Sequence, residues 1–121
     1  MIVISSKFID ERIEKWLYDI HFSIEEIESY FPAEEKNFYH YNKNSMRKRA
    51  VERHLEIVGE ALNRILKRDP SFEDKIKNAR SIVGLRNQVI HAYDNISDEN
   101  IWSILINHLP KLKNEIIRLL K

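Results

Sequence analysis

The 121-residue sequence contains no cysteine, only two glycines and only three prolines. The absence of cysteine excludes disulfide bonds and thiolate metal sites, and it is typical of a protein from a reducing compartment. No apolar run approaches the roughly 18 residues that a membrane-spanning helix needs, and the apolar segment at residues 2–4 is too short for a secretion signal. We therefore expect a cytoplasmic protein without a membrane anchor.

The scarcity of glycine and proline and the lack of strand-like alternation indicate a helical chain. Apolar residues recur at three- and four-residue spacing in three long stripes. They comprise Ile9, Ile13, Trp16, Ile20, Ile24 and Ile27; then Val51, Leu55, Val58, Leu62 and Ile65; then Ile101, Trp102, Leu105, Leu109, Leu112, Ile116 and Leu119 or Leu120. This pattern predicts a single all-α domain over residues 1–121, built as an up-and-down bundle of four main helices and a short one.

Capping residues and prolines predict where these helices begin and end. Ser5 or Ser6 is placed to cap the first helix, and Ser71 to cap the short one. Pro110 lies inside the last apolar stripe and should kink that helix near Asn107.

A further helix, expected over about residues 79–92, carries the most informative side chain of the sequence. Arg86 projects into its apolar arc, while Asn87 and His91 share the neighbouring polar flank. A guanidinium stays charged, so burying it unpaired costs several kcal/mol. Arg86 must therefore pair with a carboxylate, for which Glu60 is a candidate, reach the edge of the core, or line a cleft that receives an anion.

Charge is unevenly distributed although the net charge is only +1. Residues 10–35 contain nine acidic and two basic side chains, and residues 43–68 contain eight basic and three acidic ones. Such a molecule could offer a basic surface to phosphate, or its acidic and basic helices could pack beside each other. The aromatic residues at 38–41 could likewise stack on unpaired bases or close the open end of the bundle.

Metal chemistry finds little support in the sequence. Glu52, Glu56 and Glu60 recur on one face of the second long helix, but arginines lie within helical reach, which favours a salt-bridged surface. The histidines outside the motif show neither paired ligand spacing nor a clustered carboxylate. We expect no metal and no cofactor.

The pattern Arg86-x4-His91-x-Tyr93 resembles the signature of the HEPN superfamily, and more closely that of its HepT-like toxin subgroup. The similarity extends to residues 49–65, which resemble the subgroup's second helix with Ile-Val-Gly-Glu-Ala at its centre. Residues 82–112 resemble its motif helix, the following turn, and the Trp and Leu-Pro of its last helix. Roughly the last two thirds of the chain are covered.

This resemblance implies a HEPN-type helical bundle that forms a homodimer, in which two Arg/His motifs face one cleft. It implies the toxin of a toxin–antitoxin pair, acting as a metal-independent endoribonuclease. It also implies a minimal nucleotidyltransferase antitoxin as partner, which transfers AMP to Tyr93. Catalysis would then rest on Arg86 and His91, with Asn87 in a supporting role.

The residues themselves suit that chemistry. RNA carries its own nucleophile, the 2′-OH, so cleavage needs a base, an acid and charge stabilisation but no metal. An unperturbed histidine titrates near neutrality, which suits His91 to proton transfer. Arg86 can hold the scissile phosphate, and Asn87 can orient the imidazole or donate to phosphate. Because one imidazole cannot be base and acid at once, a two-fold dimer supplying a second His91 fits the reaction.

Structural roles compete with each of these assignments. Arg86 could be an ion-pair partner, His91 a cation at a helix C-terminus, and Tyr93 a packing residue. The competing function is a non-catalytic helical module that binds a nucleotide or docks a nucleotidyltransferase.

Overall fold

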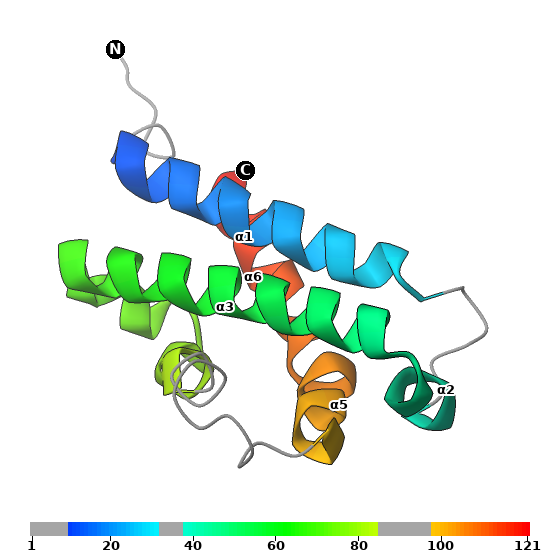
Figure 1. Cartoon of the computed structure of the whole chain (residues 1–121). Helices are drawn as coiled ribbons and strands as arrows, with labels where there is room; N and C mark the ends of the chain where they lie inside the picture. Colours follow the sequence, from blue (N-terminus) through cyan, green and yellow to red (C-terminus); the bar gives the residue numbers. More distant parts are fainter. Residues whose placement is uncertain (1–9, 32–37, 85–97) are drawn as a thin grey trace.

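A computed structural model describes residues 10–31, 38–84 and 98–121 of the chain. Its elements, in order, are α1 (Glu11–Ser29), α2 (Phe38–Lys43), α3 (Ser45–Arg68), the 3-10 helix η2 (Pro70–Asp74), α5 (Asp98–Asn107) and α6 (Leu109–Leu120), and residues 79–84 are also helical (Figure 1). No strand occurs in these three ranges. None of the helices described there is long and apolar enough to cross a membrane. The predicted all-α fold is confirmed.

The two longest helices, α1 and α3, lie side by side and run in opposite directions (Figure 1). Helix α1 also packs against α6, while η2 packs against α3. All five residues of the second predicted stripe are buried, as are the predicted residues of the first stripe within α1 except Trp16, which is half-buried. Each fully buried aliphatic side chain contributes roughly 1.5–3 kcal/mol. The stripes therefore define the core that holds these helices together.

Helix α1 begins at Glu11, not near Ser5 or Ser6 as predicted. Asp10 is its N-cap: the carboxylate Oδ1 accepts hydrogen bonds from the backbone N–H groups of Arg12 at 2.8 Å and Ile13 at 3.3 Å. These bonds satisfy amides that a helix start leaves without partners. A carboxylate thus caps α1 where the sequence pattern suggested a serine hydroxyl.

The turn after α3 differs from its prediction in the same way. Asp69, not Ser71, caps η2, since its Oδ1 accepts from the backbone N–H of Ser71 at 3.0 Å and from the Ser71 hydroxyl at 2.6 Å. Pro70 explains this, because a residue before proline is pushed into the extended conformation that an N-cap adopts. Asp69 has φ −145° and ψ 93°.

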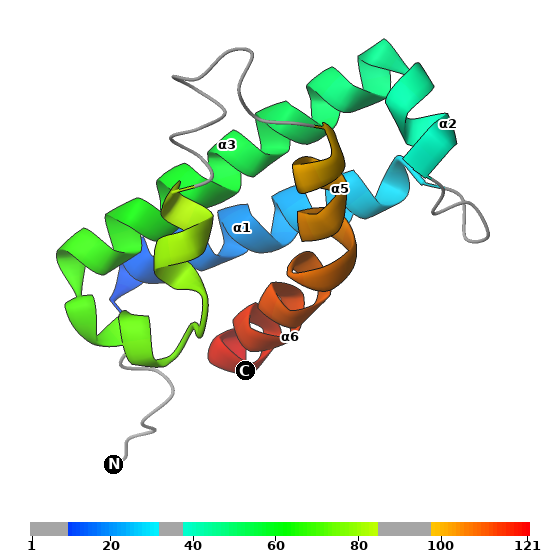
Figure 2. The same cartoon turned by 90° about the horizontal axis from the view of Figure 1, so that it is seen from below.

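The last predicted helix is divided into α5 and α6 next to its proline. Helix α5 ends at Asn107 and α6 begins at Leu109, which confirms the predicted kink. Pro110 has no backbone N–H to donate to the carbonyl one turn earlier, so the chain changes direction there (Figure 2). Ile101 on α5 and Leu112 on α6 nevertheless both reach the core.

Candidate functional site

The predicted site residues Arg86, Asn87, His91 and Tyr93 all lie in residues 85–97, outside the described residues. Their catalytic, supporting and modification roles therefore stay predictions. The structure does show how the chain on either side of them is held.

The chain before the motif is fixed to the core and to α6. Phe72 and Ile76 are buried, and Ala79 is 1% exposed. The backbone N–H of Lys77 donates to Glu115 Oε2 on α6 at 3.0 Å. After the motif, Ile101 in the first turn of α5 is completely buried. The motif segment thus begins and ends at positions anchored by core packing.

Glu60, the candidate partner of Arg86, already has one partner on its own helix. Its Oε2 accepts a hydrogen bond from Arg64 Nε at 3.0 Å. This ion pair belongs to the salt-bridged surface that the sequence favoured over a metal site. Among the described residues, no group of three or more histidine, aspartate or glutamate side chains has a geometry that could hold a metal ion.

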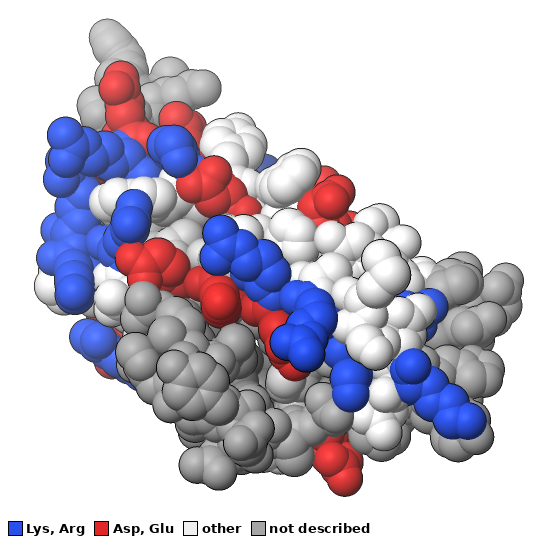
Figure 3. Space-filling model, in the orientation of Figure 1, with Lys and Arg blue, Asp and Glu red and all other residues white. Residues whose placement is uncertain are grey.

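The charge asymmetry of the sequence produces contacts between helices. Arg68 Nη2 at the end of α3 donates to Asp10 Oδ2 at 2.8 Å, and this hydrogen bond lowers the pKa of Asp10. Lys113 Nζ of α6 donates to Glu28 Oε1 at 2.7 Å near the other end of α1. Figure 3 shows basic and acidic side chains interleaved over α1 and α3, with basic ones gathered where α1 begins and α3 ends. Acidic and basic helices therefore pack together and still leave cations at the surface.

Of three hollows on the described surface, the groove between α1 and α3 has the largest volume. Its volume is about 340 Å³, and its lining residues are Trp16 and Asp19 from α1 and Arg53, Glu56, Ile57, Glu60, Ala61 and Arg64 from α3. Trp16 has no distinguishing signal in the sequence, because at helical spacing it belongs to the core stripe. In this groove the indole of Trp16, at the edge of the core, lies beside charged side chains of α3.

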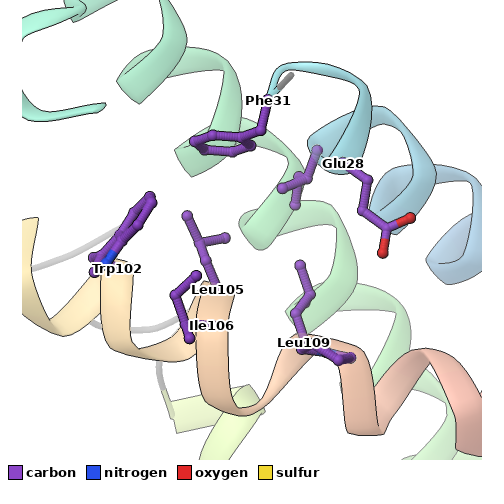
Figure 4. A pocket seen from close by; sticks show the side chains of 8 residues that line it. Glu28, Phe31, Trp102, Leu105, Ile106 and Leu109 are labelled. Carbon is purple, nitrogen blue, oxygen red and sulfur yellow. The ribbon is translucent and has the colours of Figure 1, made fainter. Parts of the chain in front are cut away.

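Another of these hollows is apolar and small. It lies between the end of α1 and the α5–α6 bend, where Phe31, Trp102, Ile106 and Leu109 face one another (Figure 4). Its volume is about 20 Å³, close to the space that one water molecule needs, so it cannot hold a metabolite.

Aromatic rings close this end of the bundle. Tyr41 is completely buried, with its ring 5.4 Å from that of Trp102 and 6.0 Å from that of Phe31. For Tyr41 the structure thus supports the closing role rather than base stacking. The side chains of residues 38–40 lie outside the description.

Sequence reasoning also missed a polar contact inside the α1–α3 interface. His54 Nδ1 lies 3.1 Å from Ser23 Oγ, and the rings of Phe22 and Tyr30 flank the imidazole. Burial lowers the pKa of His54, with Glu26 opposing and Arg53 adding to the shift. Ser23 is 1% exposed, so this pair is a structural contact and not an accessible nucleophile.

The comparisons with known proteins identify the family. A family model described as Ribonuclease HepT-like matches residues 20–119. The chain belongs to this family. The match begins inside α1, so the HepT-like similarity extends further towards the N-terminus than the resemblance quoted from the sequence. It also spans the complete segment that carries Arg86, His91 and Tyr93.

Curated relatives of this HepT-like chain agree with the assignment. "Putative RNase MJ1380" of Methanocaldococcus jannaschii is 34% identical over 106 residues, covering 86% of this chain and 93% of the relative. "Putative RNase MJ0127" of the same organism is 30% identical, covering 90% and 88%. "Putative RNase TTE0752" of Caldanaerobacter subterraneus is 27% identical, covering 90% and 91%. No solved structure matches the chain significantly. The protein is a HepT-like ribonuclease, and RNA is the substrate class that this family implies.

Proposed function

We propose that this HepT-like ribonuclease is the toxin of a toxin–antitoxin pair and cleaves cytoplasmic RNA internally, as a homodimer and without a metal. The observation that carries the proposal is the family match over residues 20–119, because it includes the whole Arg86-x4-His91-x-Tyr93 segment. The anchored flanks of this segment support it further, since catalytic side chains need a rigid base.

The proposed reaction uses the substrate's own 2′-OH. His91 accepts the proton of this hydroxyl while its oxygen attacks the adjacent phosphorus. The bond from phosphorus to the 5′-oxygen breaks, and His91 of the partner subunit donates a proton to the leaving oxygen. Arg86 stabilises the additional negative charge on the phosphate oxygens, and Asn87 orients the imidazole. The products are a 2′,3′-cyclic phosphate and a free 5′-hydroxyl.

The proposed control acts on Tyr93, which lies two residues after His91. A minimal nucleotidyltransferase antitoxin would transfer AMP from ATP to Tyr93: the hydroxyl oxygen loses its proton and attacks the α-phosphate, and pyrophosphate leaves. The added phosphate would compete with RNA phosphate for Arg86, and the added nucleoside would occupy the cleft. One modification would thereby remove both substrate binding and access to His91.

Expression without the partner tests the catalytic assignment. We expect the wild type to arrest growth and degrade RNA, and Arg86→Ala and His91→Ala to do neither, because general acid–base catalysis supplies about 10²- to 10⁴-fold of the rate. His108→Ala is the matched control, since His108 is exposed and makes no capping hydrogen bond at the start of α6. Equal toxicity and equal RNA breakdown in all four proteins would remove Arg86 and His91 from the mechanism.

A further inference from the structure

The α1–α3 groove combines an aromatic surface with open charged groups. Its volume of about 340 Å³ falls within the range of about 300–1,000 Å³ that is usual for small-ligand sites. We infer that this groove binds one unpaired nucleotide of the RNA substrate outside the catalytic motif, with the base against Trp16 and a phosphate at Arg53. The inference rests on the proposed function only in taking RNA as the substrate.

Trp16 provides the surface for the base. It packs against the core cluster from its edge, is half-buried, and contributes the only ring among the groove's lining residues. Bases of any identity stack on an indole, because every base has a flat π face. A base inside a duplex is already stacked on both sides, so this single ring favours unpaired RNA.

The charged residues of the groove are not equally available. Asp19 accepts from Lys15 Nζ at 2.9 Å, and Glu60 accepts from Arg64 at 3.0 Å. Arg53 and Glu56 stand three residues apart on α3, yet no hydrogen bond or ion pair joins either of them to another described residue. One guanidinium and one carboxylate thus face the groove with their hydrogen-bonding capacity open.

These two groups match the two polar parts of a nucleotide. The Arg53 guanidinium carries donors in a planar fork that suits phosphate oxygens. The Glu56 carboxylate only accepts, so it suits an amino or imino group of a base or the ribose 2′-OH. A guanidinium, a carboxylate and an indole along one groove therefore select a ligand that carries an anion, a donor and an aromatic plane.

Cations beyond the groove favour a strand over a free nucleotide. Arg49 lies one turn before Arg53, and Lys67 lies almost one turn beyond Arg64; both are exposed. On a helix, these four positions fall on one face and span about 27 Å from Arg49 to Lys67. A mononucleotide would reach only the groove, whereas a bound strand of several nucleotides would bring further phosphates to Arg49 and Lys67 as well.

Tryptophan fluorescence tests the inference directly in a protein that cannot cleave. The chain has two tryptophans, so His91→Ala/Trp102→Phe leaves Trp16 as the sole indole. We expect a six-residue oligoadenylate to quench its emission saturably, and expect neither a double-stranded RNA nor AMP at the same concentration to do so. Emission that stays constant while labelled RNA binds by anisotropy would overturn the inference, as would equal quenching by the duplex or by AMP.

A charge-matched pair of variants provides the second readout. In the His91→Ala background, Arg53→Ala should weaken oligonucleotide binding about tenfold, the effect of losing about 1.4 kcal/mol. Lys111→Ala should weaken it far less, since Lys111 is an exposed cation on α6. Both residues are exposed, so neither change threatens the fold. Equal losses in the two variants would show only general charge attraction and would overturn the site.

The two proposals fail separately. If the wild type cleaves RNA through His91 while the Trp16 emission never responds, the groove inference is wrong and the proposed function stands. If RNA quenches Trp16 and depends on Arg53 but the wild type does not cleave, the proposed function is wrong and the groove stands.

Discussion

His54 Nδ1 lies 3.1 Å from the hydroxyl of Ser23, and this contact joins α3 to α1 inside the main helix interface. Burial holds the pKa of His54 below its ordinary value of 6.5. The folded protein therefore prefers a neutral imidazole, whereas the unfolded chain binds a proton more readily. The burial of His54 therefore makes folding sensitive to pH just below neutrality.

We expect the free energy of unfolding to be constant above about pH 7 and to fall as the pH drops below 6.5. A depressed histidine pKa stabilises the fold above the unfolded pKa, and this contribution is lost as the pH falls towards the folded pKa. Urea unfolding at pH 7.5, 6.5 and 5.5 measures this change in the free energy of unfolding. Asp10 and Asp69 do not interfere, because their lowered pKa values place their titration below the ordinary value of 3.8.

His54→Gln should remove most of this pH dependence, since glutamine keeps a polar group near Ser23 but does not titrate. His108→Gln is the matched control and should retain it, because His108 is exposed. A His54→Gln protein that loses stability between pH 7.5 and 5.5 as steeply as the control would assign the dependence to other groups.

Gly84→Ala should stabilise the fold by about 0.5–1 kcal/mol. Gly84 is helical without a positive φ, and a methyl group at its Cα would meet no atom of residues 10–31, 38–84 or 98–121 within 4 Å. The alanine therefore restricts the unfolded chain without a clash in the folded one. A rise in the melting temperature checks this prediction, and a fall would mean that the methyl group meets a neighbour after all.

The sequence predicts the features of this fold that depend on neighbouring residues, but not those that depend on contacts between distant ones. The apolar stripe of α3 and the Pro110 kink were predictable, because helical periodicity and a missing N–H act locally. The caps were predicted wrongly at Ser5 or Ser6 and at Ser71, since serine and aspartate both suit an N-cap. At Asp10 the Arg68 ion pair, 58 residues away in sequence, adds a preference that no local pattern contains.

The residues of the two candidate sites also differ in how far the sequence reveals them. Arg86 stands out in the sequence because a charge interrupts the apolar arc of a predicted helix, and His91 stands out because it completes the Arg-x4-His pattern on the neighbouring polar flank. Trp16 and Arg53 do not stand out, because the sequence pattern places Trp16 in the core stripe and Arg53 among ordinary surface cations. Only the packing of α1 against α3 brings them to one groove.

Removal of divalent metal should leave cleavage intact. The 2′-OH of RNA is an internal nucleophile, so the proposed roles of Arg86 and His91 require no metal-bound water. We expect the rate to change less than twofold after treatment with a chelator, with products that end in a 2′,3′-cyclic phosphate. Loss of activity that added Mg²⁺ restores, or products with a 5′-phosphate, would contradict the mechanism.

Tyr93→Phe should separate cleavage from its control. The substitution removes only the hydroxyl that would accept AMP, so the uncomplexed variant should degrade RNA within about threefold of the wild-type rate if Arg86 and His91 perform the chemistry. When the nucleotidyltransferase partner and ATP are added, the wild type should gain the mass of one or more AMP groups and lose activity, while Tyr93→Phe should keep both its mass and its activity. Tyr18→Phe, which alters an exposed tyrosine on α1, is the matched control and should behave as the wild type. If Tyr93→Phe is neutralised and gains mass like the wild type, Tyr93 is not the acceptor, whereas neutralisation without any mass change would mean that the partner acts by binding alone.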